Sequence, residues 1–148
     1  MEIVIRSLQF DNCLRYETRQ KKEAWLIPFN KLEDFIVSQD IYRNGPIFFS
    51  VNSNHEDDFT YYLPINAPFE LPEETGFSFQ DSFRLKKALF LRQAVGVVDV
   101  NAAVQKLKDY ADFNKIELED TYFFVVHELY DDYIVDLFCS ILEAGGQE

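Results

Sequence analysis

The sequence predicts an α+β fold: a β-α-β-β unit occurs twice, with pseudo-twofold symmetry, and forms a curved antiparallel sheet with two helices on one face. Two observations carry this prediction. Residues 46–66 and 121–142 share an apolar run, an acidic turn and a second apolar alternation, a pattern typical of a β-hairpin. An offset of 75 residues also places 31–51 on 106–126 with seven of 21 positions identical. A period of half the chain indicates a duplication rather than a solenoid.

We expect a single domain over residues 1–148, with repeat one at about 1–66, a connector at 67–82 and repeat two at about 83–142. A chain of 148 residues can bury roughly two thirds of its unfolded surface. Hydrophobic residues make up 47% and aromatic residues 16%, which excludes a disordered chain. The composition therefore predicts a packed interior.

The first unit reads as strand, helix, strand, strand. Alternating apolar residues over 1–19 predict a long strand with a break near 11–12. A helix follows, because apolar residues recur at spacings of three and four from 29 to 36, and Pro28 is tolerated in a first helical turn. The pair Gly45-Pro46 then closes the connection and begins the first hairpin.

The second unit repeats this order. Residues 83–95 form the expected strand, Asp99 is a helix N-cap, and apolar residues from 100 to 111 share one helix face. Asn114 stands where a C-terminal cap belongs, and the second hairpin follows. The connector at 67–82 is rich in proline and acidic residues and shows little periodicity, which predicts irregular structure.

Alternation along the strands also predicts their burial. The stretch 122–126 is apolar on both faces of a strand, so we expect it at the centre of the sheet. The helix pair can cover one face of that sheet. The opposite face is rich in aromatic residues and must meet a partner, a ligand or the curvature of its own sheet.

The charge balance argues against polyanionic partners. The chain carries 14 basic and 26 acidic residues, a formal net charge of −12. Binding to DNA, RNA or an anionic membrane needs clustered Lys and Arg, so we expect no nucleic acid and no membrane partner. A basic protein or a cationic small molecule is electrostatically favoured, unless the acidic charge simply keeps the protein soluble.

Neither targeting nor metal chemistry is indicated. No apolar run approaches the roughly 20 residues of a membrane span, and the N-terminus does not read as a signal peptide, so a cytoplasmic location is expected.

Cys13 and Cys139 lack a CxxC spacing, which predicts free buried thiols. The acidic clusters beside His55 and His127 fall at expected hairpin turns, where acids are common, so no metal site and no cofactor is predicted. The sequence also lacks a Gly-rich phosphate loop and a GxSxG motif.

Glu128 is the strongest candidate for a ligand anchor. It continues the series Tyr122, Phe124 and Val126 on one strand face, so its carboxylate is directed as three large apolar groups are directed. A carboxylate among aromatic walls can capture lipophilic cations by charge and by cation–π contact. The alternative is that the strand has reached solvent by residue 128.

Aromatic residues supply candidate pocket walls, although tyrosines of this kind can equally be core residues with a satisfied hydroxyl. Together with the anchor, the candidate ligand-binding residues are Glu128, Tyr130, Phe124, Tyr61, Phe49, Tyr16 and Trp25. Tyr62 is a further candidate wall residue. No catalytic residue is predicted, because nothing basic is placed beside either cysteine.

Several short motifs carry a family resemblance. They are Gly45-Pro46 before Phe48-Phe49, the segment 62–65 before the connector, and the tetrapeptide 127–130 before the last strand. Together with the doubled unit, they resemble the gyrase-inhibitor-like (GyrI-like) family, which includes the ligand domains of multidrug-sensing transcription regulators. The resemblance covers nearly the whole chain.

The resemblance implies a pseudo-twofold domain with a central aromatic cleft and an acidic residue inside it, at the position of Glu128. It also implies a drug-binding sensor, a binder of gyrase or, in one branch, a hydrolase of strained electrophiles that uses a glutamate with aromatic partners. No helix-turn-helix precedes the first unit, so a DNA-reading role is not implied. Ser53 stands in the first hairpin where Glu128 stands in the second.

The leading hypothesis is a stand-alone small-molecule-binding domain, a sensor or a sequestering protein, that takes a lipophilic and in one version cationic ligand into an aromatic cleft anchored by Glu128. An interaction module that docks a basic protein on its acidic surface is the alternative from another class. A hydrolase of strained electrophiles is the third. The sequence leaves the oligomeric state open.

Overall fold

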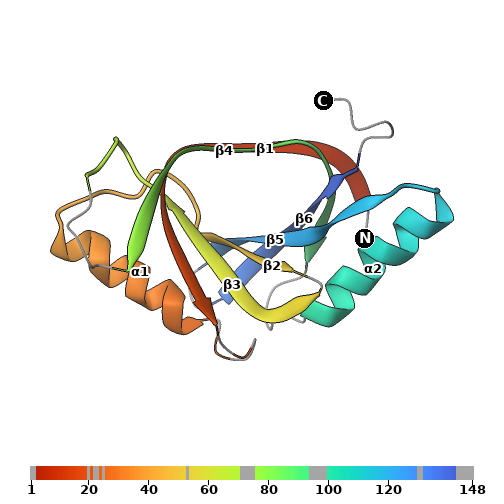
Figure 1. Ribbon diagram of the computed structural model, residues 1–148, viewed down its shortest axis with the longest axis horizontal. Helices are drawn as coiled ribbons and strands as arrows, with labels where there is room; N and C mark the ends of the chain where they lie inside the picture. The colour runs from red at the N-terminus through yellow and green to blue at the C-terminus, as the bar shows by residue number, and fades with distance from the viewer. Residues whose placement is uncertain are drawn as a thin grey trace.

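The computed structural model describes residues 3–19, 21, 24, 26–52, 54–70, 76–93, 100–129 and 132–142. Along the chain the elements are β1 (Ile3–Arg19), α1 (Leu26–Ser38), β2 (Phe48–Asn52), β3 (His55–Pro64), β4 (Phe77–Gln93), α2 (Val100–Phe113), β5 (Leu118–Leu129) and β6 (Asp132–Ile141). The order strand, helix, strand, strand therefore occurs twice, and Figure 1 shows how these elements are arranged.

The six strands close into one antiparallel barrel, in the order β1-β3-β2-β5-β6-β4. In Figure 1, β1 and β4 arch together over the two hairpins β2–β3 and β5–β6. The predicted fold class, an open curved sheet in an α+β domain, is therefore wrong, because the fold is mostly sheet and the sheet closes on itself. Closure satisfies the backbone groups that an open sheet leaves unpaired at its two edge strands.

The strand pairing is symmetric between the two halves of the barrel. In the β2–β5 pair, Phe48 lies opposite Val125 and Ser50 lies opposite Phe123. Adding 75 to the residue number of Phe48 gives Phe123, and adding 75 to that of Ser50 gives Val125. The offset therefore exchanges the two strands and preserves their pairing. The register of β1 with β4 obeys the same rule from Leu8 to Phe10, and a register shift between Arg6 and Leu8 breaks it beyond that stretch. The offset that aligns the two sequence stretches thus also relates equivalent places in the barrel.

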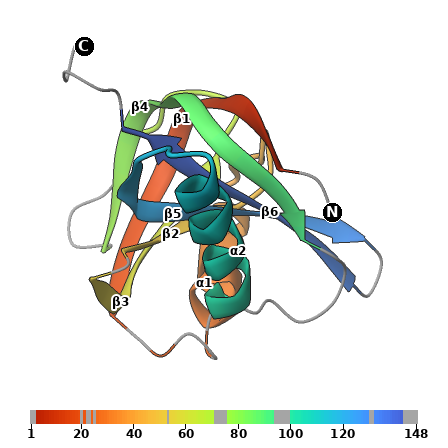
Figure 2. The same cartoon turned by 90° about the vertical axis from the view of Figure 1, so that its right-hand side faces the viewer.

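The core has two layers, one on each side of the strands. In the outer layer, Phe29 and Leu32 of α1 and Leu107 of α2 pack with Phe49 and Phe124. Figure 2 shows both helices below the β1–β4 arch. Neighbouring strand residues point to opposite sides, so one residue's difference in position decides whether a side chain faces a helix or the barrel interior.

The inner layer is an aromatic cluster within the barrel. The ring of Phe48 lies 4.7 Å from the rings of both Tyr62 and Phe83, and the ring of Phe83 lies 5.0 Å from that of Phe123. Rings at these separations pack with each other favourably. The curvature of the sheet is therefore what covers most of its aromatic face, which is one of the three alternatives that the sequence left open.

The central position predicted for 122–126 is confirmed. All five residues are buried, and β5 pairs with β2 on one side and β6 on the other. The connector prediction fails at its end, because β4 begins at Phe77 and Phe77 pairs with Tyr16 of β1. The alternation of Phe77 and Phe79 with polar neighbours was the available signal for this extension.

The helix α2 ends as its sequence suggests. Asn114 follows α2, and its side-chain nitrogen donates to the carbonyl of Tyr110 at 2.9 Å. Lys115 has a φ of 58°, and the amide of Ile116 donates to the carbonyl of Ala111 at 2.8 Å, which closes the last turn. The predicted N-cap Asp99 lies outside the described residues. In the described part of the chain, neither helix has the length and apolarity needed to cross a membrane.

Candidate functional site

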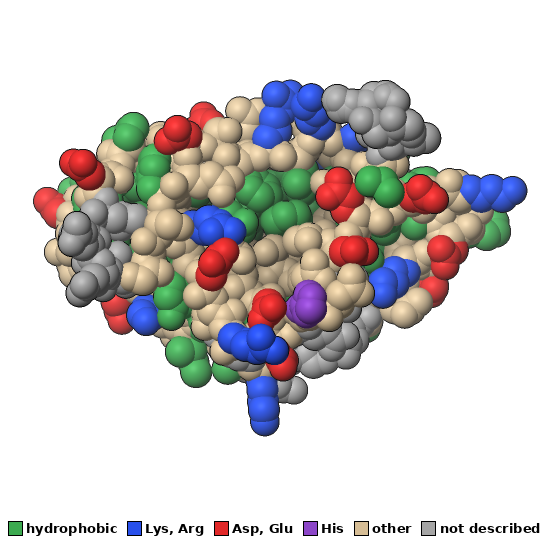
Figure 3. Space-filling model, viewed as in Figure 1, with side chains coloured by type: hydrophobic (Ala, Val, Ile, Leu, Met, Phe, Trp, Pro, Cys, Tyr) green, Lys and Arg blue, Asp and Glu red, His purple; other side chains and the backbone are tan. Residues whose placement is uncertain are grey.

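One mouth of the barrel opens into a cavity of about 410 Å³, here called the barrel-mouth cavity. Strands from both halves line it, including Tyr62 of β3, Leu85 of β4 and Phe123 of β5. The remaining lining residues are polar or charged: Arg15, Ser50, Asn52, Asp58, Thr60, Glu119, Thr121 and Ser140. The volume lies in the range of roughly 300–1,000 Å³ that is typical of ligand sites. On the face shown in Figure 3, hydrophobic side chains lie in a hollow beneath the β1–β4 arch, and charged side chains surround it.

The apolar wall of the barrel-mouth cavity is held rigidly. Tyr62 is stacked on Phe48 with an interplanar angle of 8°, and Phe83 packs against both Tyr62 and Phe123. These rings belong to the inner layer of the core, so their positions are set by packing before any ligand arrives. The cavity therefore offers two preformed aromatic side chains, Tyr62 and Phe123, within a mostly polar lining.

Ser50 supplies a buried polar group at the same place. Its side chain lines the cavity although the residue is only 8% exposed, and it lies between Thr60 and Phe123 in the sheet. Among the described residues its hydroxyl has no hydrogen-bond partner. A hydroxyl without a partner costs stability unless a ligand or water satisfies it. Thr60 adds a second hydroxyl to the lining.

Charged groups occupy the rim of the barrel-mouth cavity. The guanidinium of Arg15 lies 5.9 Å from the centre of the Tyr62 ring and forms an ion pair with Glu17 at 2.8 Å. Burial opposes its charge, but Tyr62 and Glu17 outweigh this effect and raise the pKa of Arg15. Asp58 lies 3.5 Å from a guanidinium nitrogen of Arg19, and the exposed Glu119 also lines the cavity. The rim thus has two acids and one base, and the base is already paired.

The opposite mouth has different side chains at the equivalent positions. Ser50 pairs with Thr60, and their counterparts Val125 and Asp136 pair in the same way. Val125 is 2% exposed and Asp136 is 5% exposed, so both side chains are buried at this mouth, which we call the packed mouth. Phe90 stands where the first mouth has Arg15, as the offset of 75 requires.

Asp136 is the buried charge of this second mouth. One of its carboxylate oxygens, Oδ2, lies 3.0 Å from Nε2 of His127. The other, Oδ1, lies 3.5 Å from Nη1 of Arg92 and makes no hydrogen bond in the described part of the chain. The carboxylate is therefore only partly satisfied, and its two neighbours hold it within the barrel wall.

Three of the sequence-predicted site residues lie in the helix-covered layer. Phe49, Tyr61 and Phe124 are at most 1% exposed and pack in the outer core layer. Their neighbours in sequence, Tyr62 and Phe123, are the residues that reach the barrel-mouth cavity. The aromatic wall was therefore expected on the other side of the same strands.

Tyr16 and Glu128 lie near α1, away from the barrel-mouth cavity's lining. Lys31 of α1 donates to the Tyr16 hydroxyl at 3.1 Å. One guanidinium nitrogen of Arg43 lies 3.0 Å from the carboxylate of Glu128 and 2.8 Å from that of Glu33. Trp25 and Tyr130 fall outside the described residues. A role for this set in ligand binding stays a prediction.

Burial and neighbouring charge act together on Glu33. Its pKa is raised first by burial and then by the nearby Glu128, while Arg43 acts in the opposite direction. The Glu128 side chain is itself 41% exposed. The three groups form a cluster with one more negative than positive charge, outside the aromatic interior.

Sequence reasoning missed Ser50, Thr60 and Phe123. The series 122, 124, 126 and 128 drew attention to one strand face, while the cavity is lined from the other. A signal was available in Ser50, a small polar residue between the apolar Phe49 and Val51 in a strand that pairs on both sides. Such a residue at a central position indicates either a packing need or a site.

Nucleophilic and metal chemistry find little support in the described residues. Cys13 and Cys139 are free and buried, as predicted, and burial is the main cause that raises the pKa of each thiol to about 12. Thiols in this state are poor nucleophiles at neutral pH. No group of three or more His, Cys, Asp or Glu side chains that could hold a metal ion occurs in this part of the chain.

Solved structures share the fold. No family model and no curated protein matches the sequence. The C-terminal domain of EcmrR has a TM-score of 0.68 at 11% identity, over 95% of this chain and 98% of that one. EcmrR in a DNA complex gives 0.66 at 13% identity, and the match covers 94% of this chain but 57% of that one.

A hydrolase encoded by lin2189 from Listeria innocua is also similar, with a TM-score of 0.56 at 8% identity over 93% of this chain and 91% of that one. At these identities the likeness shows the fold alone. It is consistent with a GyrI-like fold, and it includes one protein described in a complex with DNA and one described as a hydrolase.

Proposed function

We propose that this protein binds a small, largely apolar molecule in the barrel-mouth cavity and acts as a sensor or sequestering domain of the GyrI-like kind. The observation that carries the proposal is a cavity whose lining joins the packed rings of Tyr62 and Phe123 to the side chain of Ser50, a polar residue that is only 8% exposed. A ligand that offers a ring and one hydrogen-bonding group would satisfy both features.

The size of the cavity supports a small molecule. A volume of about 410 Å³ accommodates a compound with a few rings. Burying about 200 Å² of its apolar surface would contribute roughly 5 kcal/mol. Lost translational and rotational freedom offsets part of this gain, so dissociation constants of about a millimolar are expected.

The rim charges favour a neutral or cationic ligand over an anionic one. Arg15 is paired with Glu17 and Asp58 is paired with Arg19, so Glu119 is the charged lining residue that has no ion pair within the described residues. The net charge of −12 also repels anions at long range. Glu128, the anchor expected from the sequence, is the alternative source of negative charge, and the same experiment tests its role.

Binding without turnover is the simplest activity for this site. The fold likeness to the EcmrR C-terminal domain supports a ligand domain, although a protein described as a hydrolase has the same fold. Both described thiols are buried and protonated near neutral pH. The lining of the barrel-mouth cavity includes neither of them.

A thermal-shift screen followed by calorimetry tests the proposal. The panel contains neutral, cationic and anionic aromatic compounds of similar size. We expect neutral and cationic members to stabilise the protein, and Ser50→Leu, which fills the cavity, to abolish that stabilisation. Glu128→Gln is the matched control outside the cavity lining.

Two results would count against the barrel-mouth cavity as the site. One is that no compound of the panel stabilises the native protein. The other is that Ser50→Leu, with a normal circular dichroism spectrum, leaves binding intact while Glu128→Gln removes it. The second result would instead support the anchor near Arg43.

A further inference from the structure

The floor of the barrel-mouth cavity changes in chemistry from the barrel interior to the mouth. Strands β3, β2 and β5 run side by side beneath the β1–β4 arch, so residues that pair across them form rows. In the interior row, Phe48 pairs with Tyr62 on one side and with Val125 on the other. Two of these three side chains are rings, so the interior end of the floor suits the ring of a ligand.

The middle row mixes a ring with hydroxyl groups. Ser50 pairs with Thr60 on one side and with Phe123 on the other, and all three line the cavity. Ser50 is 8% exposed, although its side chain is polar. The polar part of the lining therefore begins inside the barrel and not at the rim.

The mouth row consists of neutral hydrogen-bonding groups on β2 and β5. Asn52 pairs with Thr121, and both line the cavity, as does Ser140 of the neighbouring strand β6. The side-chain amide nitrogen of Asn52 donates to the hydroxyl of Thr121 at 3.5 Å, which uses one of its two N–H groups. The other N–H group and the hydroxyl hydrogen of Thr121 can donate to a ligand.

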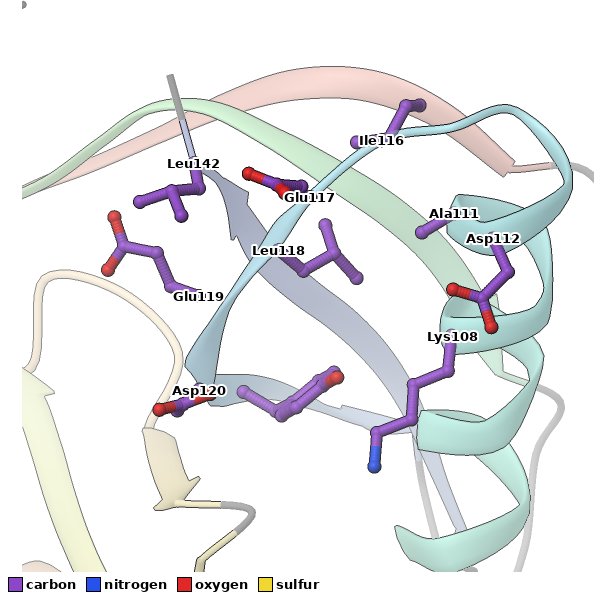
Figure 4. Close-up of a pocket in the computed structure, with 10 residues that line it drawn as sticks. Lys108, Ala111, Asp112, Ile116, Glu117, Leu118, Glu119, Asp120 and Leu142 are labelled. Atoms are coloured by element: carbon purple, nitrogen blue, oxygen red, sulfur yellow. The ribbon is translucent and has the colours of Figure 1, made fainter. Parts of the chain in front are cut away.

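Alternation along β5 keeps this polar end on the cavity side. In Figure 4, Leu118 projects from the start of β5 towards α2, whereas Glu119 projects away from it. Glu119, Thr121 and Phe123 follow one another at a spacing of two, and all three line the cavity. From the rim inwards, β5 therefore presents a carboxylate, then a hydroxyl, then a ring.

We propose that the ligand of the barrel-mouth cavity is a neutral ring compound that carries several hydroxyl groups at one end. This inference rests on the function proposed above and names the chemical class of its ligand. The ring lies against Tyr62 and Phe123, and the hydroxyl groups face the middle row and the mouth row. Hydroxyl groups both donate and accept, so they can exchange hydrogen bonds with serine, threonine and asparagine side chains. An apolar cation would contact the rings and leave these polar groups without a partner.

A matched series of ligands tests the proposal by calorimetric titration in mildly acidic buffer, where phenols are neutral. Coumarin has a fused ring system and a carbonyl acceptor, which is all that the proposed function requires. Its dihydroxy derivative, esculetin, carries hydroxyl groups on the ring itself, and its glucoside, skimmin, carries them on an attached sugar. We expect at least one of these two compounds to bind about fivefold more tightly than coumarin. The larger gain identifies which arrangement of hydroxyl groups the site accepts.

Threonine-to-valine variants assign this gain to the polar rows, because valine has the shape of threonine and lacks its hydroxyl. Thr60→Val and Thr121→Val should each weaken binding of the hydroxylated compound about three- to fivefold and leave coumarin binding unchanged. Thr18→Val is the matched control. Thr18 of β1 pairs with Phe59 and does not line the cavity, so this variant should bind every compound as the native protein does.

The outcomes separate this inference from the proposed function. If coumarin binds and neither hydroxylated compound binds more tightly, the inference fails and the proposed function stands. If none of the three compounds binds, both fail. The inference is also overturned if Thr60→Val and Thr121→Val both leave the gain intact, if they weaken coumarin binding equally, or if Thr18→Val removes the gain as they do.

Discussion

The two mouths of the barrel occupy equivalent positions in a symmetric strand arrangement, yet their chemistry differs. At one mouth Ser50 and Thr60 are small and leave a cavity of about 410 Å³. At the other, Val125 and Asp136 fill the same positions and are buried. The comparison teaches that backbone symmetry places the sites, while two side chains decide which site is open.

The two mouths also differ in how far their polar groups are hydrogen-bonded. The open mouth leaves a neutral hydroxyl without a partner in the described residues, which water or a ligand can satisfy at low cost. The packed mouth holds a carboxylate between His127 and Arg92 with one oxygen lacking a hydrogen bond. A buried charge of this kind tolerates little change around it. The open mouth is therefore suited to binding and releasing a ligand, whereas the packed mouth contributes to the stability of the fold.

The largest effect is expected in the aromatic interior that lies between the two mouths. Phe48 is fully buried in the aromatic interior and stacks on both Phe10 and Tyr62. Phe48→Ala should lower the free energy of unfolding by about 3–5 kcal/mol. Urea denaturation measures this change. Phe113→Ala is the control, because Phe113 is 87% exposed; equal losses for both variants would contradict the assigned core.

A smaller effect is expected from the charge partners of the two mouths. Arg92 and Glu17 occupy equivalent positions. Arg92 pairs in the sheet with Asp136, Glu17 pairs with Thr60, and Asp136 and Thr60 are themselves equivalent. Arg92→Gln should cost about 1–3 kcal/mol by weakening the compensation of a buried carboxylate. Glu17→Gln should cost only about 0–1 kcal/mol, because the pair it breaks lies near the surface. Similar losses by chemical denaturation would remove the distinction between the mouths.

Exchanging the small residues tests what opens a mouth. Val125→Ser should lower stability by about 1–2 kcal/mol, because it buries a hydroxyl and leaves space in a packed region. Ser50→Val should change stability by less than about 1 kcal/mol and reduce binding of aromatic compounds. Denaturation and thermal shift with ligand measure the two effects. Unchanged ligand binding in Ser50→Val would show that this position does not shape the site.

The smallest effect concerns a carboxylate outside both mouths. The pKa of Glu33 is raised in the folded protein, first by burial, so ionising it works against folding. Its contribution is fully present below the ordinary pKa of a glutamate and is lost as pH rises through the raised value. The loss should stay below about 1 kcal/mol because the group is partly solvated. Denaturation at a series of pH values should show a flatter profile for Glu33→Gln; a steeper profile would contradict the direction.

The sequence predicted the elements better than their closure. Hairpins, helices and the central strand 122–126 follow from local periodicity, which depends on neighbouring residues. Closure depends on the pairing of β1 with β4, whose partners are far apart in the chain. The alternation of apolar and polar residues in either strand does not identify the strand it pairs with. A sheet that does not close was therefore the natural expectation.

The candidate site was missed for a related reason. Tyr61 and Tyr62 are adjacent, but one packs in the helix-covered layer and the other lines the barrel-mouth cavity. Period-two alternation shows that the two sides differ and does not show which side holds a cavity. Only the closed sheet reveals that the aromatic face without helices is partly hollow.

Each strand of the barrel has a neighbour on both sides, and the two halves meet along two seams, β1 with β4 and β2 with β5. The two halves can separate only if the strand pairing at both seams is broken. We therefore expect this chain to unfold in a single all-or-none transition. A molecule bound between strands of both halves would therefore hold the two halves together.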